Sequence, residues 1–401
     1  MFWFELGREF KLSIAEILTV FPFVKIVYID EKICIIDGVK KEVILEKVSN
    51  LGGTIKVFEV QKSFLNNSKI ADIWTYIKDF LLSKREWKLS YGLSVFWKSP
   101  IELKKFLMNL KHAFREMWVN SRFINQDFKN LSSAQIIGEK LVKKETDISL
   151  VYSEENSFIG NTIWIQDIEA YGKRDYGKIR DMENIGMLPP KLAQMMINLS
   201  RDTSIGSVFR IYDPFVGLGT VLIESLHMGN NSVFWSDYNP EMVISSRKNI
   251  SDTAQEFSLD IIKYEIIELD ANDIATSSIL KNQSIDAIVT EGYLGKLFNA
   301  RTLDLDSIHS ERKLLASMYE NFFSGLKKLH FLWTVVISFP FWEVQKKYHY
   351  FEEIYQIIEK YCTIESILLP TLSFKPTKVG SLLYKRPNQI VGREIFKLRM
   401  K

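Results

Sequence analysis

The chain has 401 residues, 46% of them hydrophobic and 25% charged, with a formal net charge of +3. This length exceeds what one hydrophobic core ordinarily holds, so we expect two or three domains, and the composition is that of a soluble globular protein. The N-terminal segment carries charges at Glu5, Arg8 and Glu9, and the longest apolar run, residues 331–342, is shorter than the roughly 20 residues that span a bilayer. We therefore expect no signal peptide, no membrane partner and a cytoplasmic location.

Cysteine and histidine are scarce in this chain. Cys34 and Cys362 lie far apart in the sequence, and the five histidines show no spacing typical of metal ligands. We therefore expect neither a disulfide framework nor a metal site.

Residues 1–58 are expected to form a small α+β domain. A helix is predicted over residues 13–21, and β-rich runs follow at 25–30 and 32–38. The sequence NLGGT at 50–54 is typical of a turn and ends this segment.

Residues 59–167 are expected to form a second domain, in which helices alternate with strands. A helix that begins beside Ser132 is predicted with particular clarity, because Ser132 and Gln135 have the spacing of a capping box and Leu131 is placed for a hydrophobic staple. The other predicted elements are a helix near 70–82, a basic helix whose apolar stripe runs from Leu103 to Phe114, and strands near 91–97, 148–152 and 162–168.

A basic surface is predicted in this second domain. Between residues 60 and 145, Lys and Arg are twice as frequent as Asp and Glu, and aromatic residues lie among them. The alternative is a solvated helix face whose apolar side, from Leu103 to Phe114, builds the core. The candidate RNA-binding residues are Lys98, Lys104, Lys105, Lys111, Arg115 and Arg122.

A polar, charged segment at residues 168–185 is predicted to be a linker. From residue 186 to residue 401, predicted strands alternate with predicted helices. This β-α-β pattern indicates an α/β domain with a mainly parallel sheet.

The strongest chemical signal is the segment RIYDPFVGLGTVLIESLHMG at 210–229. An apolar strand ends at Asp213, Gly217 and Gly219 bend the backbone, and a helix begins at Thr220. Such a loop brings backbone N–H groups close to a nucleotide-like ligand, which is NAD, FAD or S-adenosylmethionine. The preceding DPF and the absence of a third glycine at the dinucleotide spacing favour S-adenosylmethionine.

Two further acids end the next two predicted strands. Asp237 follows the glycines by about 20 residues, where a carboxylate accepts the ribose hydroxyls, and Asp270 is placed to meet the adenine. Each acid alone is also explained as a turn former at a strand end. Three successive acidic strand ends favour a cofactor site.

Several segments together resemble the THUMP-containing tRNA guanosine-N2 methyltransferases that modify guanosine 10. In the C-terminal half they are GMLPPKLAQMMINLS, DPFVGLGTVLIES, SDYNPEMV, DAIVTEGYLG and YKRPNQIVGREIFKL. In the N-terminal half they are YGLSVFW, NLSSAQIIGEKL and IGNTIWIQDIEAYGKRDYGKIRD. The resemblance implies a ferredoxin-like and THUMP region that holds tRNA, followed by a Rossmann-like class I methyltransferase domain.

The resemblance also implies roles for single residues. The cofactor S-adenosylmethionine would have its methionine side near Asp213, its ribose near Asp237 and its adenine near Asp270. The full set of implied cofactor-binding residues is Asp213, Pro214, Phe215, Gly217, Gly219, Thr220, Asp237, Tyr238, Asp270 and Ala271.

The segment DAIVTEGYLG at 286–295 departs from the pattern of related amino-methyltransferases, which have two prolines after the acid or Asn that ends this strand. Aligned by the strand, Glu291 is the acceptor for the substrate amine and Tyr293 stacks on the flipped base; aligned by Tyr293, Thr290 takes the acid's place. Gly292 stands where proline would pre-set the loop, so we expect a freer loop and a tolerated Gly292→Pro if φ near −65° is accessible.

The expected activity is direct methyl transfer to a guanosine N2 of tRNA, without a covalent enzyme intermediate. Two alternatives stay open: a noncatalytic tRNA-binding protein with a degenerate methyltransferase fold, and an enzyme that methylates another RNA or DNA amine. Some eukaryotic members of the family need a small zinc-binding activator subunit, and the sequence leaves that requirement open.

Overall fold

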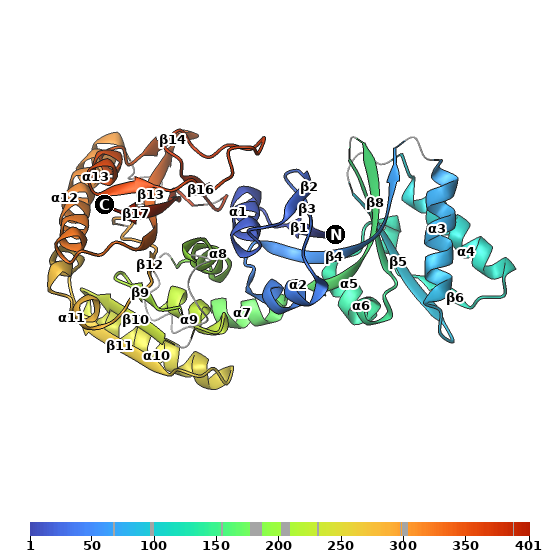
Figure 1. Ribbon diagram of the computed structural model, residues 1–401, viewed down its shortest axis with the longest axis horizontal. Helices are drawn as coiled ribbons and strands as arrows, with labels where there is room; N and C mark the ends of the chain where they lie inside the picture. The colour runs from blue at the N-terminus through green and yellow to red at the C-terminus, as the bar shows by residue number, and fades with distance from the viewer. Residues whose placement is uncertain are drawn as a thin grey trace. The chain divides into compact units, whose positions relative to one another are not determined.

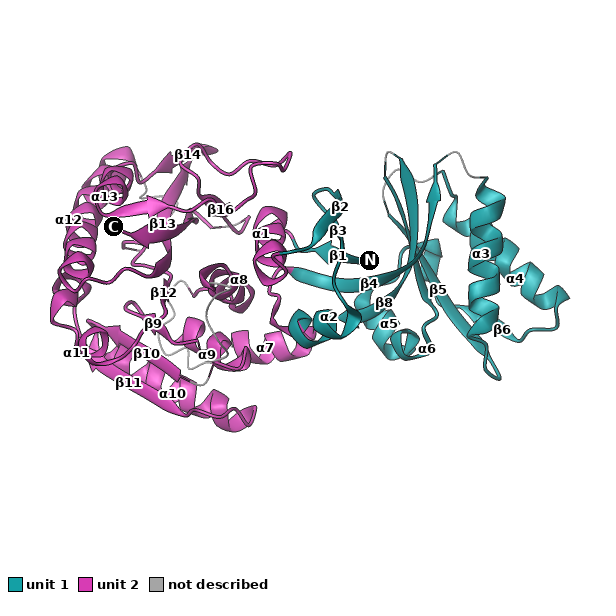
Figure 2. Cartoon of the chain, viewed as in Figure 1, with its two compact units in different colours: residues 1–7, 23–48, 54–166 teal, residues 8–22, 49–53, 167–401 magenta. Residues whose placement is uncertain are grey.

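The computed structural model describes residues 1–66, 69–96, 100–153, 155–176, 187–201, 209–230, 232–296, 298, 304–387 and 389–401. They form two compact units, coloured separately in Figure 2. The first unit comprises residues 1–7, 23–48 and 54–166, and the second comprises 8–22, 49–53 and 167–401. None of the helices described in these ranges has both the length and the apolar character needed to cross a membrane.

The first unit is built on one mixed sheet. Its eight strands follow the order β2-β3-β1-β4-β8-β7-β5-β6. The strands are β1 (Phe2–Leu6), β2 (Lys25–Ile29), β3 (Ile33–Asp37), β4 (Thr54–Leu65), β5 (Leu89–Phe96), β6 (Ser121–Phe123), β7 (Asp147–Tyr152) and β8 (Asn156–Ile165). The helices of this unit are α2 (Lys41–Lys47), α3 (Ile70–Ser83), α4 (Leu103–Glu116), α5 (Ser133–Gly138) and α6 (Leu141–Lys144).

The amphipathic pattern of α4 is confirmed. Phe106, Leu107, Leu110 and Phe114 are buried in one cluster with residues of α3, β5 and β7, and Leu103 packs against that cluster. Figure 1 shows α3 and α4 beside the strands β5 and β6. The cations of α4 lie on the opposite, exposed face of the helix.

The predicted helix cap at Ser132 is confirmed. The Ser132 hydroxyl accepts a hydrogen bond from the Gln135 N–H at 3.3 Å, and the Gln135 side chain accepts one from the Ser132 N–H at 3.0 Å. Leu131 and Ile136 share a buried cluster, as a hydrophobic staple requires.

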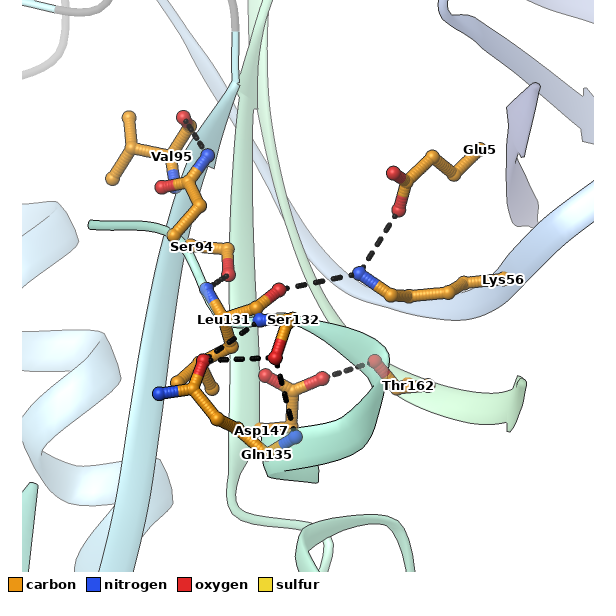
Figure 3. Close-up of polar contacts among 10 residues, drawn as sticks. Glu5, Lys56, Ser94, Val95, Leu131, Ser132, Gln135, Asp147 and Thr162 are labelled. Carbon is orange, nitrogen blue, oxygen red and sulfur yellow. Dashed lines mark hydrogen bonds and ion pairs between the residues drawn. The ribbon is translucent and has the colours of Figure 1, made fainter. Parts of the chain in front are cut away.

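A polar network lies inside the first unit, next to this cap (Figure 3). Lys56 forms an ion pair with Glu5 at 3.2 Å and donates to the Leu131 carbonyl at 3.5 Å. Thr162 donates to Asp147, whose burial raises its pKa to about 6. These contacts join β1 to β4 and β7 to β8, and Lys56 also contacts the residue before the cap of α5. Lys56, Asp147 and Thr162 are buried, so their polar contacts lie inside the unit.

The second unit has a sheet with strand order β11-β10-β9-β12-β13-β17-β15, flanked by β14 on β13 and β16 on β17. Its strands are β9 (Ile211–Asp213), β10 (Ser232–Asp237), β11 (Lys263–Glu268), β12 (Ala287–Thr290), β13 (Thr334–Val344), β14 (Lys347–Tyr350), β15 (Cys362–Ile364), β16 (Leu382–Tyr384) and β17 (Val391–Met400). The pairs from β11 to β13 are parallel, as predicted, but the pairs that involve β14, β15, β16 and β17 are antiparallel, so the sheet is mixed rather than mainly parallel. Strand β17 runs antiparallel to β13.

Helices pack around this second sheet, and a large aromatic core lies under α12 and α13. The helices are α1 (Phe10–Val20), α7 (Ile168–Tyr176), α8 (Pro190–Ser200), α9 (Thr220–His227), α10 (Pro240–Glu256), α11 (Ser278–Asn282), α12 (Leu305–Lys328) and α13 (Glu353–Tyr361). Residues 168–176 of the predicted linker are thus helical, and residues 177–185 lie outside the described residues.

Part of the N-terminal sequence belongs to the second unit. Helix α1 packs against α8, and the buried carboxylate of Glu16 accepts hydrogen bonds from the N–H groups of Gly52 and Gly53, both at 2.9 Å, and from Asn198 at 2.8 Å. Strand β4 also continues across residue 58. The division at residues 58, 167 and 185 stays a prediction.

Candidate active site

The acids predicted at three strand ends lie at one edge of the parallel sheet. Asp213 ends β9, Asp237 ends β10, and Asp270 follows β11 by two residues. Strand β9 has β10 on one side and β12 on the other. Successive strands are therefore added first toward one edge of the sheet and then toward the other, and β9 is the point at which this order switches. In open α/β sheets, ligands bind outside the carboxyl ends of the strands at such a switch point.

The glycine loop between β9 and α9 has the backbone conformation that its sequence predicts. Gly217 and Gly219 have φ values of +50° and +88°, which side-chain-bearing residues adopt with strain. A Cβ added to Gly217 would meet no atom within 4 Å, so the loop leaves open space there for a ligand. The Gly217 N–H donates to Asp237 at 3.0 Å, which ties the loop to the next strand end.

Asp213 is the most perturbed acid of this edge. Burial raises its pKa to about 7, and the charges of Asp237 and Glu291 act in the same direction. The Thr290 hydroxyl and the Phe215 N–H donate to its carboxylate and oppose that rise. Asp213 therefore changes its charge near neutral pH.

Asp237 and Asp270 are held by backbone N–H groups at the starts of the following turns. Asp237 accepts from Asn239 at 3.0 Å as well as from Gly217, and burial raises its pKa. Asp270 accepts from the Asn272 N–H at 2.9 Å and caps the short helix Ala271–Thr276. Both carboxylates are thus fixed before any ligand binds.

Two hollows lie along this edge of the sheet. The first is lined by Met187, Leu188, Asp213, Phe215, Val216, Gly217, Leu218, Thr220, Val221 and Glu291. The second is lined by Tyr238, Glu268, Leu269, Asp270, Asp273 and Thr276. Asp237 holds Gly217, which lines the first hollow. Among the described residues, Pro214, Gly219 and Ala271 lie in the same loops without lining either hollow.

Glu291, which lines the first hollow, is anchored by a residue that the sequence reasoning did not single out. The Nε atom of Arg393, on β17, donates to the Glu291 carboxylate. The Arg393 side chain is only 2% exposed, and it also donates to Gln389 at 3.4 Å. The strand 391–400 also carries Glu394, Lys397 and Arg399, so the sequence alone did not show that Arg393 is buried and needs a partner. A buried charge is costly without one.

Residues 291–293, directly after β12, are held in place by packing. Gly292 has φ +36°, and an added Cβ would lie 2.6 Å from the Tyr319 hydroxyl and 2.7 Å from the Ser338 carbonyl. The Tyr319 hydroxyl donates to the Tyr293 carbonyl at 2.9 Å. The expectation of a free loop that tolerates Gly292→Pro is therefore wrong, since proline needs a negative φ and more space than this site has.

The other two candidate residues of this loop, Thr290 and Tyr293, differ in exposure and in their contacts. Thr290 is buried and donates to Asp213, whereas the Tyr293 side chain is 42% exposed. Tyr293 is not among the residues that line either hollow, but its ring is exposed enough to stack on a base, while the Thr290 hydroxyl is already bonded to Asp213.

The basic candidates of the first unit differ in their surroundings. Lys104 and Lys111 lie over the rings of Phe128 and Phe123, at 5.4 and 5.7 Å from the ring centroids. Arg122 forms an ion pair with Glu139 at 2.7 Å. Lys105 and Arg115 are exposed, and Lys98 lies outside the described residues.

Neither cysteine of the chain lines the two hollows. Cys34 and Cys362 are buried free thiols, and burial raises the pKa of each to about 12. In the part of the chain that the structure describes, no group of three or more His, Cys, Asp or Glu side chains is arranged to hold a metal ion. The available chemistry at this edge is that of carboxylates, hydroxyls and an aromatic ring.

Comparisons with known proteins agree with this geometry. Residues 177–339 match the family described as "RMKL-like, methyltransferase domain". The tRNA (guanine(10)-N2)-dimethyltransferase of Methanothermobacter thermautotrophicus is 34% identical over 140 residues, which is 35% of this chain and 37% of that protein. The enzyme of the same name from Methanocaldococcus jannaschii is 29% identical over 152 residues, or 38% of this chain and 41% of that protein.

These matches span less than half of the relatives' own length. Among solved structures, TrmN from Thermus thermophilus shares the fold over the whole of both chains, with a TM-score of 0.51 at 13% identity. The predicted fold class and the resemblance to tRNA guanosine-N2 methyltransferases are confirmed. The C-terminal part of the chain is thus a Rossmann-like domain that matches, over residues 177–339, the RMKL-like methyltransferase domains.

Proposed function

We propose that the protein is an S-adenosylmethionine-dependent methyltransferase that acts on the exocyclic N2 of a guanosine in tRNA, at position 10. One observation carries the proposal: Asp213, Asp237 and Asp270 lie on three neighbouring strand ends around an open glycine loop, next to the Glu291 loop at the switch point. The names of the related enzymes supply the substrate class.

The residues present fit this cofactor. The open space at Gly217 admits a ligand against the backbone, and the fixed carboxylates of Asp237 and Asp270 lie at or just after the ends of the next two strands of the sheet. We assign Asp213 to the methionine side, Asp237 and Tyr238 to the ribose, and Asp270 to the adenine side. Once bound, the cofactor supplies an electrophilic methyl group on a sulfonium.

The protein's own contribution to the reaction is positioning and electrostatics. The lone pair of guanine N2 is delocalised into the ring, so an acceptor must hold an N–H bond of the amine and aim its nitrogen at the methyl group. Glu291, anchored by Arg393, takes this role and accepts the proton that nitrogen loses. Tyr293 stacks on the flipped base. The carbon–sulfur bond breaks as the carbon–nitrogen bond forms, and no cysteine adduct is needed.

In this proposal the first unit binds the tRNA. Exposed cations on α4 attract the phosphate backbone of the tRNA. The proposal also includes a ferredoxin-like and THUMP fold for this region and a cytoplasmic location for the protein. The assay below, with and without added cell extract, tests whether this chain needs an activator subunit of the kind that some eukaryotic members of the family need.

The experiment that tests the proposal is methylation of tRNA by the purified full chain with labelled S-adenosylmethionine, followed by mass spectrometry of the nucleosides. A matched tRNA carries inosine at position 10, because inosine is guanosine without the N2 amine. N2-methylguanosine that disappears in the inosine tRNA supports the proposal. Retained tRNA binding without transfer, with or without added cell extract, would identify a noncatalytic binding protein, and label on adenosine or on DNA would overturn the choice of amine.

A further inference from the structure

Trp118 adopts a backbone conformation that its residue type disfavours. It lies two residues after the end of α4 and has φ +54°, in the left-handed region where glycine is favoured. For a bulky side chain this conformation costs about 1–2 kcal/mol. This conformation closes α4, because the Trp118 N–H donates to the Arg115 carbonyl at 3.1 Å and the Val119 N–H donates to the Phe114 carbonyl at 2.8 Å, as in a Schellman cap. The Trp118 side chain is 95% exposed, so packing within the unit does not explain an indole at a position that glycine usually fills.

A second exposed indole lies at the same end of the sheet. Trp87 is 92% exposed and lies two residues before β5. Strands β5 and β6 are parallel, Leu89 pairs with Ser121, and the Leu89 N–H donates to the Asn120 carbonyl at 2.9 Å. Trp87 and Trp118 therefore both precede the N-terminal ends of paired strands. Among the described large hydrophobic residues, they are the two most exposed.

A cationic stripe leads along α4 to Trp118. Residues at spacings of three and four lie on one face of a helix, and all members of this stripe are exposed. The stripe consists of Lys104, Met108, Lys111 and Arg115, and Trp118 follows it two residues after the helix ends. The acid near its end, Glu116, faces His112 at 3.5 Å. The stripe thus offers three positive charges, and the flat aromatic face of Trp118 follows them.

We propose that Trp118 and Trp87 stack on unpaired bases of the RNA whose backbone follows the α4 stripe. This inference rests on the proposed function, which supplies an RNA substrate, and it adds a base-stacking contact to the charge contacts. Aromatic rings beside cations suit single-stranded nucleic acid, since every base offers a π-face and the cations meet the phosphates. A protein partner would instead favour a contiguous apolar centre with few charges.

The test measures binding of the full chain to tRNA and to a short single-stranded oligoribonucleotide at several salt concentrations. Trp118→Ala and Trp87→Ala should each weaken binding roughly 5- to 150-fold, which corresponds to about 1–3 kcal/mol for each stacked base. The dependence on salt should stay unchanged, because no charge is removed. Trp118→Tyr should restore most of the affinity. The matched control is Trp333→Ala, a half-exposed indole of the second unit, which should bind normally.

Trp118→Gly separates function from folding. Glycine adopts the positive φ without strain, so this variant should have an equal or higher Tm and yet bind RNA as weakly as Trp118→Ala. If the wild-type chain binds RNA and all the Trp variants bind equally well, the stacking inference is wrong and the proposed function stands. If the wild-type chain binds no RNA, the proposed function fails and this inference fails with it. Variants that lose binding to anionic lipid vesicles while RNA affinity is unchanged would also overturn it.

Discussion

The two units hold their charges in opposite ways. In the second unit, Asp213 and Asp237 are buried, are fixed by N–H donors, and have pKa values raised by burial. In the first unit, Lys105 and Arg115 are exposed on a helix surface. Fixed, desolvated groups suit a small ligand that contacts a few atoms closely, whereas exposed cations suit a large polyanion bound by many salt-sensitive contacts. We therefore expect the second unit to control cofactor affinity and the first unit to control RNA affinity.

The largest effect is expected at the buried ion pair of the second unit. Arg393→Ala leaves the Glu291 carboxylate without its buried partner, so we expect a loss of about 3–5 kcal/mol in unfolding free energy. Methyl transfer should be lost as well. Thermal unfolding and the transfer assay measure both, and Lys105→Ala in the first unit is the control. Unchanged stability and activity would show that the pair has no role.

A slightly smaller effect is expected at the packed loop. Gly292→Ala combines a strained φ with a Cβ that would lie 2.6 Å from Tyr319, so we expect about 2–3 kcal/mol of destabilisation and weakened transfer. The matched control is Gly138→Ala, where an added Cβ meets no atom within 4 Å. Equal behaviour of the two variants in a melting experiment would argue against the packed loop.

Cofactor affinity should depend on the second unit alone. Asp237→Ala removes a charged acceptor from the proposed ribose site, and we expect S-adenosylhomocysteine to bind about 1.5–3 kcal/mol more weakly in calorimetry. Binding of tRNA should remain nearly intact, because its contacts are assigned to the first unit. A variant that keeps full cofactor affinity would remove Asp237 from the site.

The charge state of Asp213 predicts a pH dependence. Its pKa of about 7 means that the carboxyl is mostly protonated at pH 6, and a protonated carboxyl attracts the ammonium of the cofactor less. We expect affinity for S-adenosylhomocysteine to rise with pH and level off above pH 7, and Asp213→Asn to abolish this trend.

The sign for stability is the reverse. The folded state binds the Asp213 proton more tightly than the unfolded state, so without cofactor the unfolding free energy should fall as pH rises from about 4 to 7. In Asp213→Asn this contribution should vanish from a series of melts. If the stability of the wild type rose through this pH range relative to that of Asp213→Asn, the assignment would be wrong.

The smallest effects are expected from single cations of the first unit. Lys105→Ala should change tRNA affinity only slightly, whereas neutralising Lys104, Lys105 and Lys111 together should weaken binding and flatten its salt dependence. Cofactor affinity should not change. If the triple variant lost as much cofactor affinity as tRNA affinity, the two units would not control the two affinities separately.

Much of the cofactor site followed from sequence because its parts are local. A strand, two glycines and a helix start lie within ten residues at 211–220, and the left-handed backbone of Gly217 and Gly219 follows from the need for a tight turn. The ends of parallel strands share one edge, which places Asp213, Asp237 and Asp270 together without knowledge of the tertiary contacts. The cap at Ser132 is local in the same sense.

Only the tertiary structure decided the contacts between distant segments. Arg393 and Glu291 are 102 residues apart, and the collision of a side chain at 292 with Tyr319 depends on where α12 packs. The inclusion of α1 in the second unit and the exposure of Trp118 likewise depend on which surfaces the fold covers. Periodicity and turn chemistry describe a residue's neighbours within a few positions, whereas partners and burial are set by the packing of elements far apart along the chain.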